Sequence, residues 1–410
     1  MAAIADKRPV ARSVRNDPKD GWHPEAPRRT RPAVLVVPIV APTMPEAHYE
    51  LGRRVGEAVR RVVARRVAST PRRLLLRQLR GARACRSFLD ACAARKSLPD
   101  VLRDGLMDYA LSLAAWTEAA RPARALDRIV LDGTPVTADE LTFWLQDDNT
   151  GCQTGLYRRS DGGVLFWHAE EDTIGFFDRP RIAAFDVAGR RASAFLYPYL
   201  LPGPAFGWSD DEFHAVDSLS TRGPNSSAGM LTSVACWLSW RLGARIDLGQ
   251  LARALRPFAD GCAIHRVARR GSYVVGEKVE IGGRHILRTR LPASPGRHTF
   301  QVNLVSDPSS PLAGAERLSA RSRTPYENRV ARMHRVLDAL RAGGDRLEPT
   351  GIVHLMASRA GGGYAWANAD VKAHCVGIMT EGDFQLHVRG GAARAGDRYS
   401  PQWAGTQRGP

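Results

Sequence analysis

The chain has 410 residues, 44% of them hydrophobic, and a formal net charge of +17. This length and composition allow a large buried core and exclude a chain too polar to fold. Its six cysteines form no CxxC pair, its first forty residues lack the apolar core of a secretory signal, and no uncharged apolar run could span a bilayer. We therefore expect a cytoplasmic protein without a disulfide framework, a metal site or a membrane segment.

Arginine supplies most of the positive charge, since only five of the 59 basic residues are lysine. The arginines accompany abundant alanine and glycine, which indicates a bias toward GC-rich codons. Ten of them nevertheless fall within residues 53–80, with no acidic residue between Glu57 and Asp90. Such a stretch can meet phosphates, a carrier protein or a coenzyme A tail, although a solvated helical face is the simpler interpretation. We do not expect nucleic acid as a partner.

The first half of the chain is predicted to be mostly helical. Residues 1–32 are polar, basic and rich in proline, and we expect a disordered tail there. A branched aliphatic run over 33–40 predicts a buried strand that ends before Pro42. Apolar residues then recur at helical spacing over 45–126, interrupted by prolines, so the segment 33–151 is expected to form a helical portion.

The second half, residues 152–410, is predicted to be rich in strands. Short apolar or alternating runs are separated by Gly, Asp and Pro, and they lie at 163–167, 192–197, 230–240, 264–267, 272–281, 299–305 and 375–379. Two helices are expected among them. One covers 247–255 with Asp247 as its N-cap, and the other begins at the capping box Thr324–Glu327 and ends at Gly343. This pattern predicts an α+β fold of layered helices and sheets.

Cys152 has the setting of a self-cleaving N-terminal nucleophile. Gly151 precedes it, Thr154 follows two residues later, and the apolar run 164–167 comes next. The thiol can attack the carbonyl of Gly151, which has no side chain to obstruct it, and an acyl shift with hydrolysis would free a new α-amine. An α-amine ordinarily has a pKa of about 7.7–8.0, so it can accept the proton of a cysteine thiol, whose ordinary pKa is about 8.5. A buried cysteine acting only as a small apolar residue is the alternative.

Four segments are more informative together than singly. They are Tyr49–Gly56 (YELGRRVG), Asp139–Thr154 with GCQT at its end, Asp161–Asp172 (DGGVLFWHAEED) and Gly223–Gly229 (GPNSSAG). They resemble the Y-E-x-G-x-x-x-G stretch, the helix, loop and Gly-Cys-Thr-Thr cleavage site, the N-G-x-x-x-G-H-N-E-D-W segment and the G-F-N-S-A-G turn of one family. These are the acyl-coenzyme A:6-aminopenicillanic acid acyltransferases and their C45 peptidase relatives, which are self-processing N-terminal nucleophile (Ntn) hydrolases. The resemblance extends over about residues 45–390.

The resemblance implies a four-layer αββα sandwich and cleavage between Gly151 and Cys152 into two chains that stay together. It also implies reaction at an amide, ester or thioester carbonyl. The acyl group of a small-molecule or peptide donor, with acyl-coenzyme A as one candidate, would rest on the Cys152 sulfur before passing to water or to an amine acceptor. No bound cofactor and no metal are implied.

The family pattern also assigns individual residues. The expected catalytic residues are Cys152, Thr154, Glu171 and Asn303, and the expected substrate-binding residues are Glu170, Asp172, Asn225, His298 and Arg359. Two departures concern the same site. Ala169 stands where the family commonly has asparagine, and the segment around Asn303 only partly matches the H-T-N-H pattern that helps to form the oxyanion hole. Gln301 or backbone N–H groups are alternatives there.

Two other functions are compatible with the sequence. Cys152 can be the nucleophile of an uncleaved cysteine enzyme with His168 or His298 as its base, as in papain-like sites. Alternatively, the chain is a non-catalytic basic binding protein that uses its arginine-rich face. An intact chain with a trappable thiol would favour the first, and salt-sensitive binding that is indifferent to Cys152 would favour the second.

Overall fold

The first described part of the chain forms four α-helices, a short 3-10 helix and three strands, two of which have only two residues each. The computed structural model describes residues 34–125, 129–146, 151–171, 179–219, 229–305, 320–343, 348–358, 366, 371–393 and 403–405. Its first elements are β1 (Leu35–Ala41), α1 (Met44–Ser69), α2 (Arg72–Ala93), α3 (Asp100–Ala120), η1 (Pro122–Ala125), β2 (Val130–Leu131), β3 (Thr134–Pro135) and α4 (Ala138–Leu145). The aliphatic run and the helical spacing thus give a strand and helices, as expected. The expectation that the strand is buried is wrong, because only Val37 and Ile39 of β1 are buried and Val40 is 80% exposed. The predicted tail over 1–32 lies outside the described residues.

Two of these helices, α1 and α4, begin at a residue whose side chain caps the helix. The side chain of Thr43 accepts a hydrogen bond from the backbone N–H of Glu46 at the start of α1, and Thr137 with Glu140 forms a reciprocal capping box at α4. Helix α1 lies very close to α3, because a Cβ atom at Gly52 would come within 2.7 Å of the Trp116 carbonyl oxygen. Glycine is therefore required at that crossing.

Most of the remaining chain forms two sheets. The eight-stranded sheet has the order β1-β6-β7-β8-β9-β10-β11-β12, and the six-stranded sheet has the order β13-β4-β5-β14-β15-β16. The added strands of the first are β6 (Arg181–Val187), β7 (Arg190–Phe195), β8 (Gly207–Ser209), β9 (Glu212–Ser218), β10 (Gly261–Arg270), β11 (Tyr273–Gly282) and β12 (His285–Arg290). Those of the second are β4 (Gly151–Arg158), β5 (Val164–Glu171), β13 (His298–Gln301), β14 (Val371–Met379), β15 (Phe384–Gly390) and β16 (Trp403–Gly405). The chain is therefore a mixed α+β fold.

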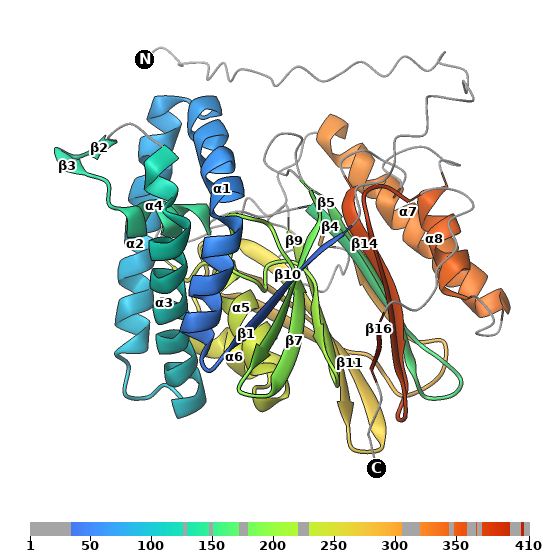
Figure 1. The fold of residues 1–410 in the computed structure, drawn as a ribbon. Helices are drawn as coiled ribbons and strands as arrows, with labels where there is room; N and C mark the ends of the chain where they lie inside the picture. The colour runs from blue at the N-terminus through green and yellow to red at the C-terminus, as the bar shows by residue number, and fades with distance from the viewer. Residues whose placement is uncertain are drawn as a thin grey trace. The chain divides into compact units, whose positions relative to one another are not determined.

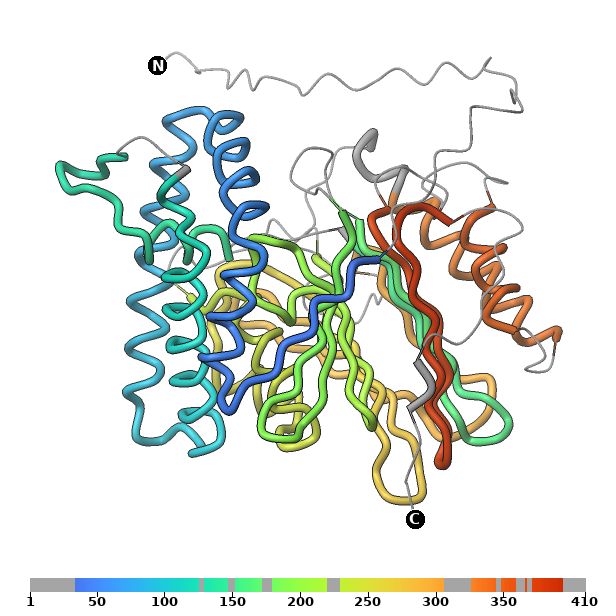
Figure 2. The backbone as a smooth tube through the Cα atoms, in the orientation of Figure 1, coloured from blue at the N-terminus to red at the C-terminus, as the bar shows by residue number. Residues whose placement is uncertain are grey.

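Strand β1 belongs to the eight-stranded sheet, although helices α1 to α4 separate it in the chain from the other strands of that sheet. It pairs in parallel with β6, whereas the other neighbouring strands of both sheets pair antiparallel. The blue trace of β1 in Figure 2 leads into α1 and lies against the green strands of the eight-stranded sheet. Residues more than a hundred positions apart are thereby held in one sheet.

Four further helices cover the sheets: α5 (Thr232–Leu242), α6 (Leu248–Leu255), α7 (Ala320–Gly343) and α8 (Pro349–Ala357). Figure 1 shows α7 and α8 beside the six-stranded sheet, where Met333 and Ile352 share an apolar cluster with Trp167 of β5. Helices α5 and α6 belong to a second apolar cluster with the eight-stranded sheet. The two sheets contact each other directly, since the rings of Phe166 and Phe213 stack with centroids 4.1 Å apart.

The structure differs from the sequence prediction in four further places. The run 230–240, predicted as a strand, forms helix α5, whose residues are buried on nearly all sides, so that an apolar run carries no period by which to distinguish helix from strand. Helix α7 begins at Ala320 rather than at the Thr324 capping box, although it ends at Gly343 as predicted. A favourable start signal does not prevent the preceding residues from extending a helix. The strand expected over 299–305 is short and ends at Gln301, and α8 is absent from the sequence prediction.

No described helix combines the length and the apolar character that crossing a membrane requires. All six cysteines are present as buried thiols.

Candidate active site

The candidate site lies on one face of the β4–β5 pair. Cys152 is directly opposite Glu170 in the antiparallel register, and Thr154 is directly opposite His168. Because side chains alternate along a strand, these four residues project from the same face of the sheet. That face carries Phe166 and meets the eight-stranded sheet. The register therefore gathers four polar side chains between the two sheets.

The carboxylate of Glu170 is the centre of this group. The thiol of Cys152 donates to Glu170 Oε2 at 3.4 Å, and the hydroxyl of Tyr197 donates to the same oxygen at 2.8 Å. His168 Nε2 lies 2.8 Å from Glu170 Oε1, and its Nδ1 lies 2.7 Å from the Thr154 hydroxyl oxygen. A proton on Nε2 suits the carboxylate, and Nδ1 then accepts from the hydroxyl. We call these five buried residues the Cys152 cluster.

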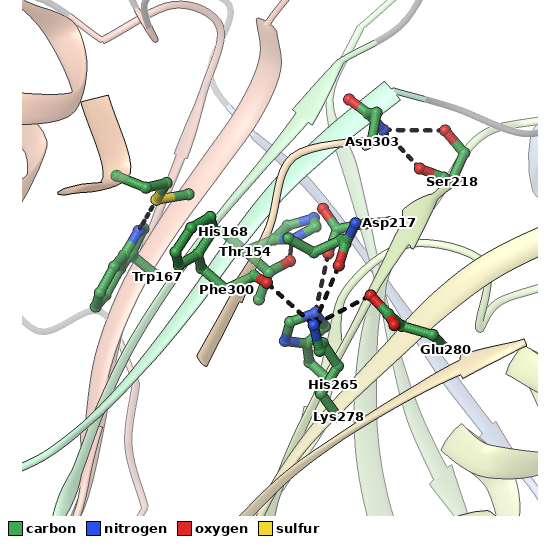
Figure 3. Close-up of polar contacts among 12 residues, drawn as sticks. Thr154, Trp167, His168, Asp217, Ser218, His265, Lys278, Glu280, Phe300 and Asn303 are labelled. Carbon is green, nitrogen blue, oxygen red and sulfur yellow. Dashed lines mark hydrogen bonds and ion pairs between the residues drawn. The ribbon is translucent and has the colours of Figure 1, made fainter. Parts of the chain in front are cut away.

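The eight-stranded sheet adds charged residues next to this cluster. Asp217 of β9, His265 of β10, and Lys278 and Glu280 of β11 are all buried, and Figure 3 shows Asp217 beside Thr154 and His168. Asp217 Oδ2 lies 3.3 Å from His265 Nε2. Lys278 Nζ lies 3.2 Å from Glu280 Oε1 and 3.3 Å from both the Phe300 carbonyl oxygen and the side-chain oxygen of Gln301. The space between the sheets is thus polar at this end.

Burial has the largest effect on the pKa values of Asp217 and His265, which face the Cys152 cluster. It raises the pKa of Asp217 to about 7, against the opposing effects of the nearby His168 and Thr154 side chains. Burial, helped by the positive charge of Lys278, lowers the pKa of His265 well below its usual value. His265 is therefore neutral at physiological pH, and Asp217 is poised between its two protonation states.

Glu171 points to the opposite face of the sheet. It forms an ion pair with Arg329 of α7 and accepts a hydrogen bond from Gln153. Arg329 also donates to the side-chain oxygen of Asn303. The amide nitrogen of Asn303 donates to the Ser218 carbonyl oxygen at 2.9 Å and to its hydroxyl at 3.0 Å. Glu171 and Asn303, both expected to be catalytic, are therefore joined to each other through Arg329, and Glu170 occupies the position at the thiol.

The remaining predicted residues are dispersed. Strand β13 pairs with β4 so that Gln301 is opposite Thr154, whereas His298 is opposite Tyr157, toward the other end of β4. There, His298 Nδ1 lies 3.3 Å from an Arg341 nitrogen. Only the backbone of Gly151 is described, as the first residue of β4. The predicted residues Asp172, Asn225 and Arg359 lie outside the described residues.

Several polar residues of this region have no role in the sequence prediction. They are Tyr197, Asp217, His265, Lys278 and Arg329, and each comes from a part of the chain other than β4 and β5. A charged residue that directly follows two apolar residues, as Asp217 follows Ala215 and Val216, is a signal that could have drawn attention to one of them. Their proximity to Cys152 depends on the pairing and stacking of the sheets.

The arginine-rich stretch is partly occupied by internal contacts. Arg53 and Arg54 both pair with Glu50 on α1, and Arg80 of α2 pairs with Asp132. The guanidinium of Arg66 lies over the ring of Trp144, 4.6 Å from its centroid. These contacts use several of the charges within the fold, so the stretch is less available to a polyanion than its composition indicates.

One group of side chains in the described part of the chain has the composition and closeness of a metal-binding set. Ligand atoms of Cys152, His168 and Glu170 all lie within 4.8 Å of one another. The same three residues carry the hydrogen bonds described above, so the arrangement can serve proton transfer or metal binding.

No protein-family model matches the chain, and no curated protein is similar to it.

Proposed function

We propose that this chain is a self-processing enzyme with an N-terminal cysteine nucleophile, which acts as an amide acyltransferase or an amidohydrolase. The observation that carries the proposal is the position of Cys152: it follows Gly151 at the start of a buried strand, and its thiol donates to a carboxylate. The motif resemblance to the C45 peptidase family supports the same assignment.

Self-cleavage needs a base for the thiol before any α-amine exists. In the uncleaved chain the nitrogen of Cys152 is an amide and cannot accept a proton. Glu170 Oε2, 3.4 Å from the sulfur, is placed to take the thiol proton as the sulfur attacks the Gly151 carbonyl carbon. Collapse of the tetrahedral adduct breaks the C–N bond, and the proton passes to the departing nitrogen. The product is a thioester on Cys152 with a free α-amine.

Hydrolysis of that thioester leaves a carboxylate on Gly151 and returns the thiol of Cys152. In later turnovers the new α-amine takes the thiol proton, the sulfur attacks the carbonyl of the donor, and an acyl-enzyme forms. Water or an amine then accepts the acyl group. Glu170, held by Tyr197 and His168, orients this site in the role expected of Glu171. An acyl-coenzyme A or an amide is a suitable donor, and no bound cofactor is needed.

The arrangement of layers supports the same proposal. Helices α7 and α8 pack on the six-stranded sheet, the two sheets meet through Phe166 and Phe213, and α5 and α6 pack with the eight-stranded sheet. We propose that this is the αββα sandwich of the Ntn hydrolases. A reducing cytoplasmic location, consistent with six free thiols, belongs to the proposal.

Intact-mass measurement and N-terminal sequencing test the proposal. We expect two chains, covering residues 1–151 and 152–410, that copurify and separate only on denaturation, because the new termini arise inside one folded core. The proposal is wrong if folded, active protein consists of a single uncut chain.

The rival cysteine enzyme has weaker geometric support. The imidazole of His168 is engaged by Glu170 and Thr154, and His298 lies toward the other end of β4. Glu170, which accepts the hydrogen bond of the thiol, is therefore better placed than either histidine to act as the base. An uncut chain whose activity requires both Cys152 and His168 would favour the rival.

A further inference from the structure

Besides its role in proton transfer, the Cys152 cluster has the side-chain atoms of a metal-binding site. The cross-strand pairing of Cys152 with Glu170, and the position of His168 two residues earlier on the same face, bring sulfur, oxygen and nitrogen donors together. The sulfur is 3.4 Å from one oxygen of Glu170, and His168 Nε2 is 2.8 Å from the other. A tetrahedral zinc ion with bonds of about 2.0–2.3 Å needs neighbouring ligand atoms at separations of about 3.3–3.7 Å. Small side-chain adjustments reach that geometry.

Charge and ligand softness select the kind of ion. A thiolate and a carboxylate together carry two negative charges, and the neutral imidazole carries none. A divalent cation would leave this fully buried group neutral, whereas an uncompensated charge is costly in such surroundings. Thiolate and imidazole are ligands that zinc prefers, whereas magnesium and calcium prefer oxygen alone.

We propose that the Cys152 cluster binds a thiophilic divalent cation of the zinc class through Cys152 Sγ, His168 Nε2 and Glu170, and that the bound ion opposes self-cleavage. The second clause rests on the proposed function. As the metal–sulfur bond forms, the thiol proton passes to solvent, so one proton is released per ion from that group. The imidazole proton of His168 moves from Nε2 to Nδ1, where the Thr154 hydroxyl oxygen accepts it, and Nε2 is then free to bind the ion. The sulfur lone pair is then used in the bond to the metal. Glu170, also bound to the metal, no longer accepts a proton. Both requirements for attack on Gly151 are removed.

Cobalt provides a readout independent of activity. Co²⁺ in a site of this kind gives a thiolate-to-metal charge-transfer absorption in the near ultraviolet, and we expect one ion per chain. Cys152→Ser should abolish the band, and Glu170→Gln should weaken binding. Cys236→Ser is the matched control, because the buried sulfurs of Cys236 and Cys262 lie 3.9 Å apart and form the rival thiol site. Retention of the full band in Cys152→Ser, or its loss in Cys236→Ser alone, would overturn the proposal.

X-ray absorption on zinc-loaded wild-type protein removes any dependence on the folding of variants. We expect one sulfur at about 2.3 Å and nitrogen or oxygen neighbours at about 2.0–2.1 Å. Two sulfurs, or none, would overturn the assignment.

The effect on cleavage is measured separately. Chain refolded with excess Zn²⁺ should remain uncut, and a chelator should then release cleavage at Cys152. Cleavage at the same rate with and without bound zinc would overturn the inhibitory part. A chain that binds one zinc through one sulfur but never cleaves would contradict the proposed function while leaving the metal site established.

Discussion

The two faces of the β4–β5 pair are built from neighbouring residues and yet differ in kind. The face toward α7 carries Trp167 and Ala169, which pack with Met333 and other helix residues in an apolar cluster. The face toward the eight-stranded sheet carries Cys152, His168 and Glu170, which are just as buried but polar. Apolar burial stabilises the fold, whereas burial of polar groups costs free energy unless each finds a partner. The difference indicates that the apolar residues of the face toward α7 serve stability, whereas the polar residues of the face toward the eight-stranded sheet serve chemistry.

This comparison predicts that substitutions on the two faces fail in different ways. We call the face toward the eight-stranded sheet the inner face and the face toward α7 the outer face. Substitutions on the inner face should remove cleavage and acyl transfer while leaving a folded chain. Substitutions on the outer face should lower the free energy of unfolding while leaving the chemistry of the folded fraction intact.

The largest effect is expected from the nucleophile. Cys152→Ala should abolish both cleavage and acyl transfer, because the same sulfur performs both, at a cost in stability of a few kcal/mol at most. Cys152→Ser should cleave slowly, since a hydroxyl is the poorer nucleophile near neutral pH. Mass spectrometry and an amidase or acyl-transfer assay measure the two losses. Turnover retained by Cys152→Ala would refute the mechanism.

The next largest effect distinguishes the adjacent glutamates. Glu170→Gln keeps the shape of the side chain but removes the proton acceptor, and we expect cleavage to slow by about 10²- to 10⁴-fold. Glu171→Gln is the matched control: it weakens the ion pair with Arg329 on the other face, so it should lower the thermal midpoint and change the cleavage rate far less. Time courses of cleavage after refolding compare the two. If Glu171→Gln is the slower variant, the assignment of faces is reversed.

An outer-face substitution should act on stability. A Cβ atom at Gly155 would lie 2.1 Å from the Trp167 ring, so Gly155→Ala should destabilise the fold by about 1–3 kcal/mol through overpacking. Gly81→Ala in α2 is the control, because no atom lies within 4 Å of the added carbon, and it should stabilise by about 0.5–1 kcal/mol. Urea unfolding of both variants in the Cys152→Ala background gives the values without interference from cleavage. Equal stability of the two variants would count against close packing on this face.

A pH dependence is expected on the face toward the eight-stranded sheet. The pKa of Asp217 is raised to about 7 by burial, so between about pH 4 and pH 7 the folded state holds a proton that the unfolded state has lost. The contribution of Asp217 to stability therefore falls as the pH rises through this window, by at most about 1.4 kcal/mol per pH unit. Facing charged and polar groups are Thr154, His168, Glu170, His265 and Lys278.

Asp217→Asn removes this titration. The difference in unfolding free energy between wild type and variant, measured by urea titration at several pH values, should shift in favour of the variant as the pH rises. Taking the difference cancels the other buried groups that titrate nearby, such as His214, whose pKa is lowered to about 4. A difference that does not change between pH 5 and pH 7.5 would contradict a raised pKa.

Local sequence was sufficient for the elements whose signals are local. The aliphatic run became β1, the helical spacing over 45–126 became α1 to α3, and Asp247 caps α6 through the backbone N–H of Gln250. The Gly-Cys pair was equally legible as a candidate cleavage site. Helix α5 was not, because its burial on nearly all sides leaves no period to read.

The sequence around Cys152 shows a Gly-Cys pair and, beyond the apolar run 164–167, two adjacent glutamates. Once the structure places those glutamates on one strand, alternation makes them face opposite ways. Which of them faces the thiol depends on the register of β4 against β5, and that register is a property of the fold. Asp217 on β9 and Tyr197, just after β7, meet the site only when the sheets stack. Side-chain alternation is a local property of the chain, whereas register and stacking depend on contacts between residues far apart in the sequence.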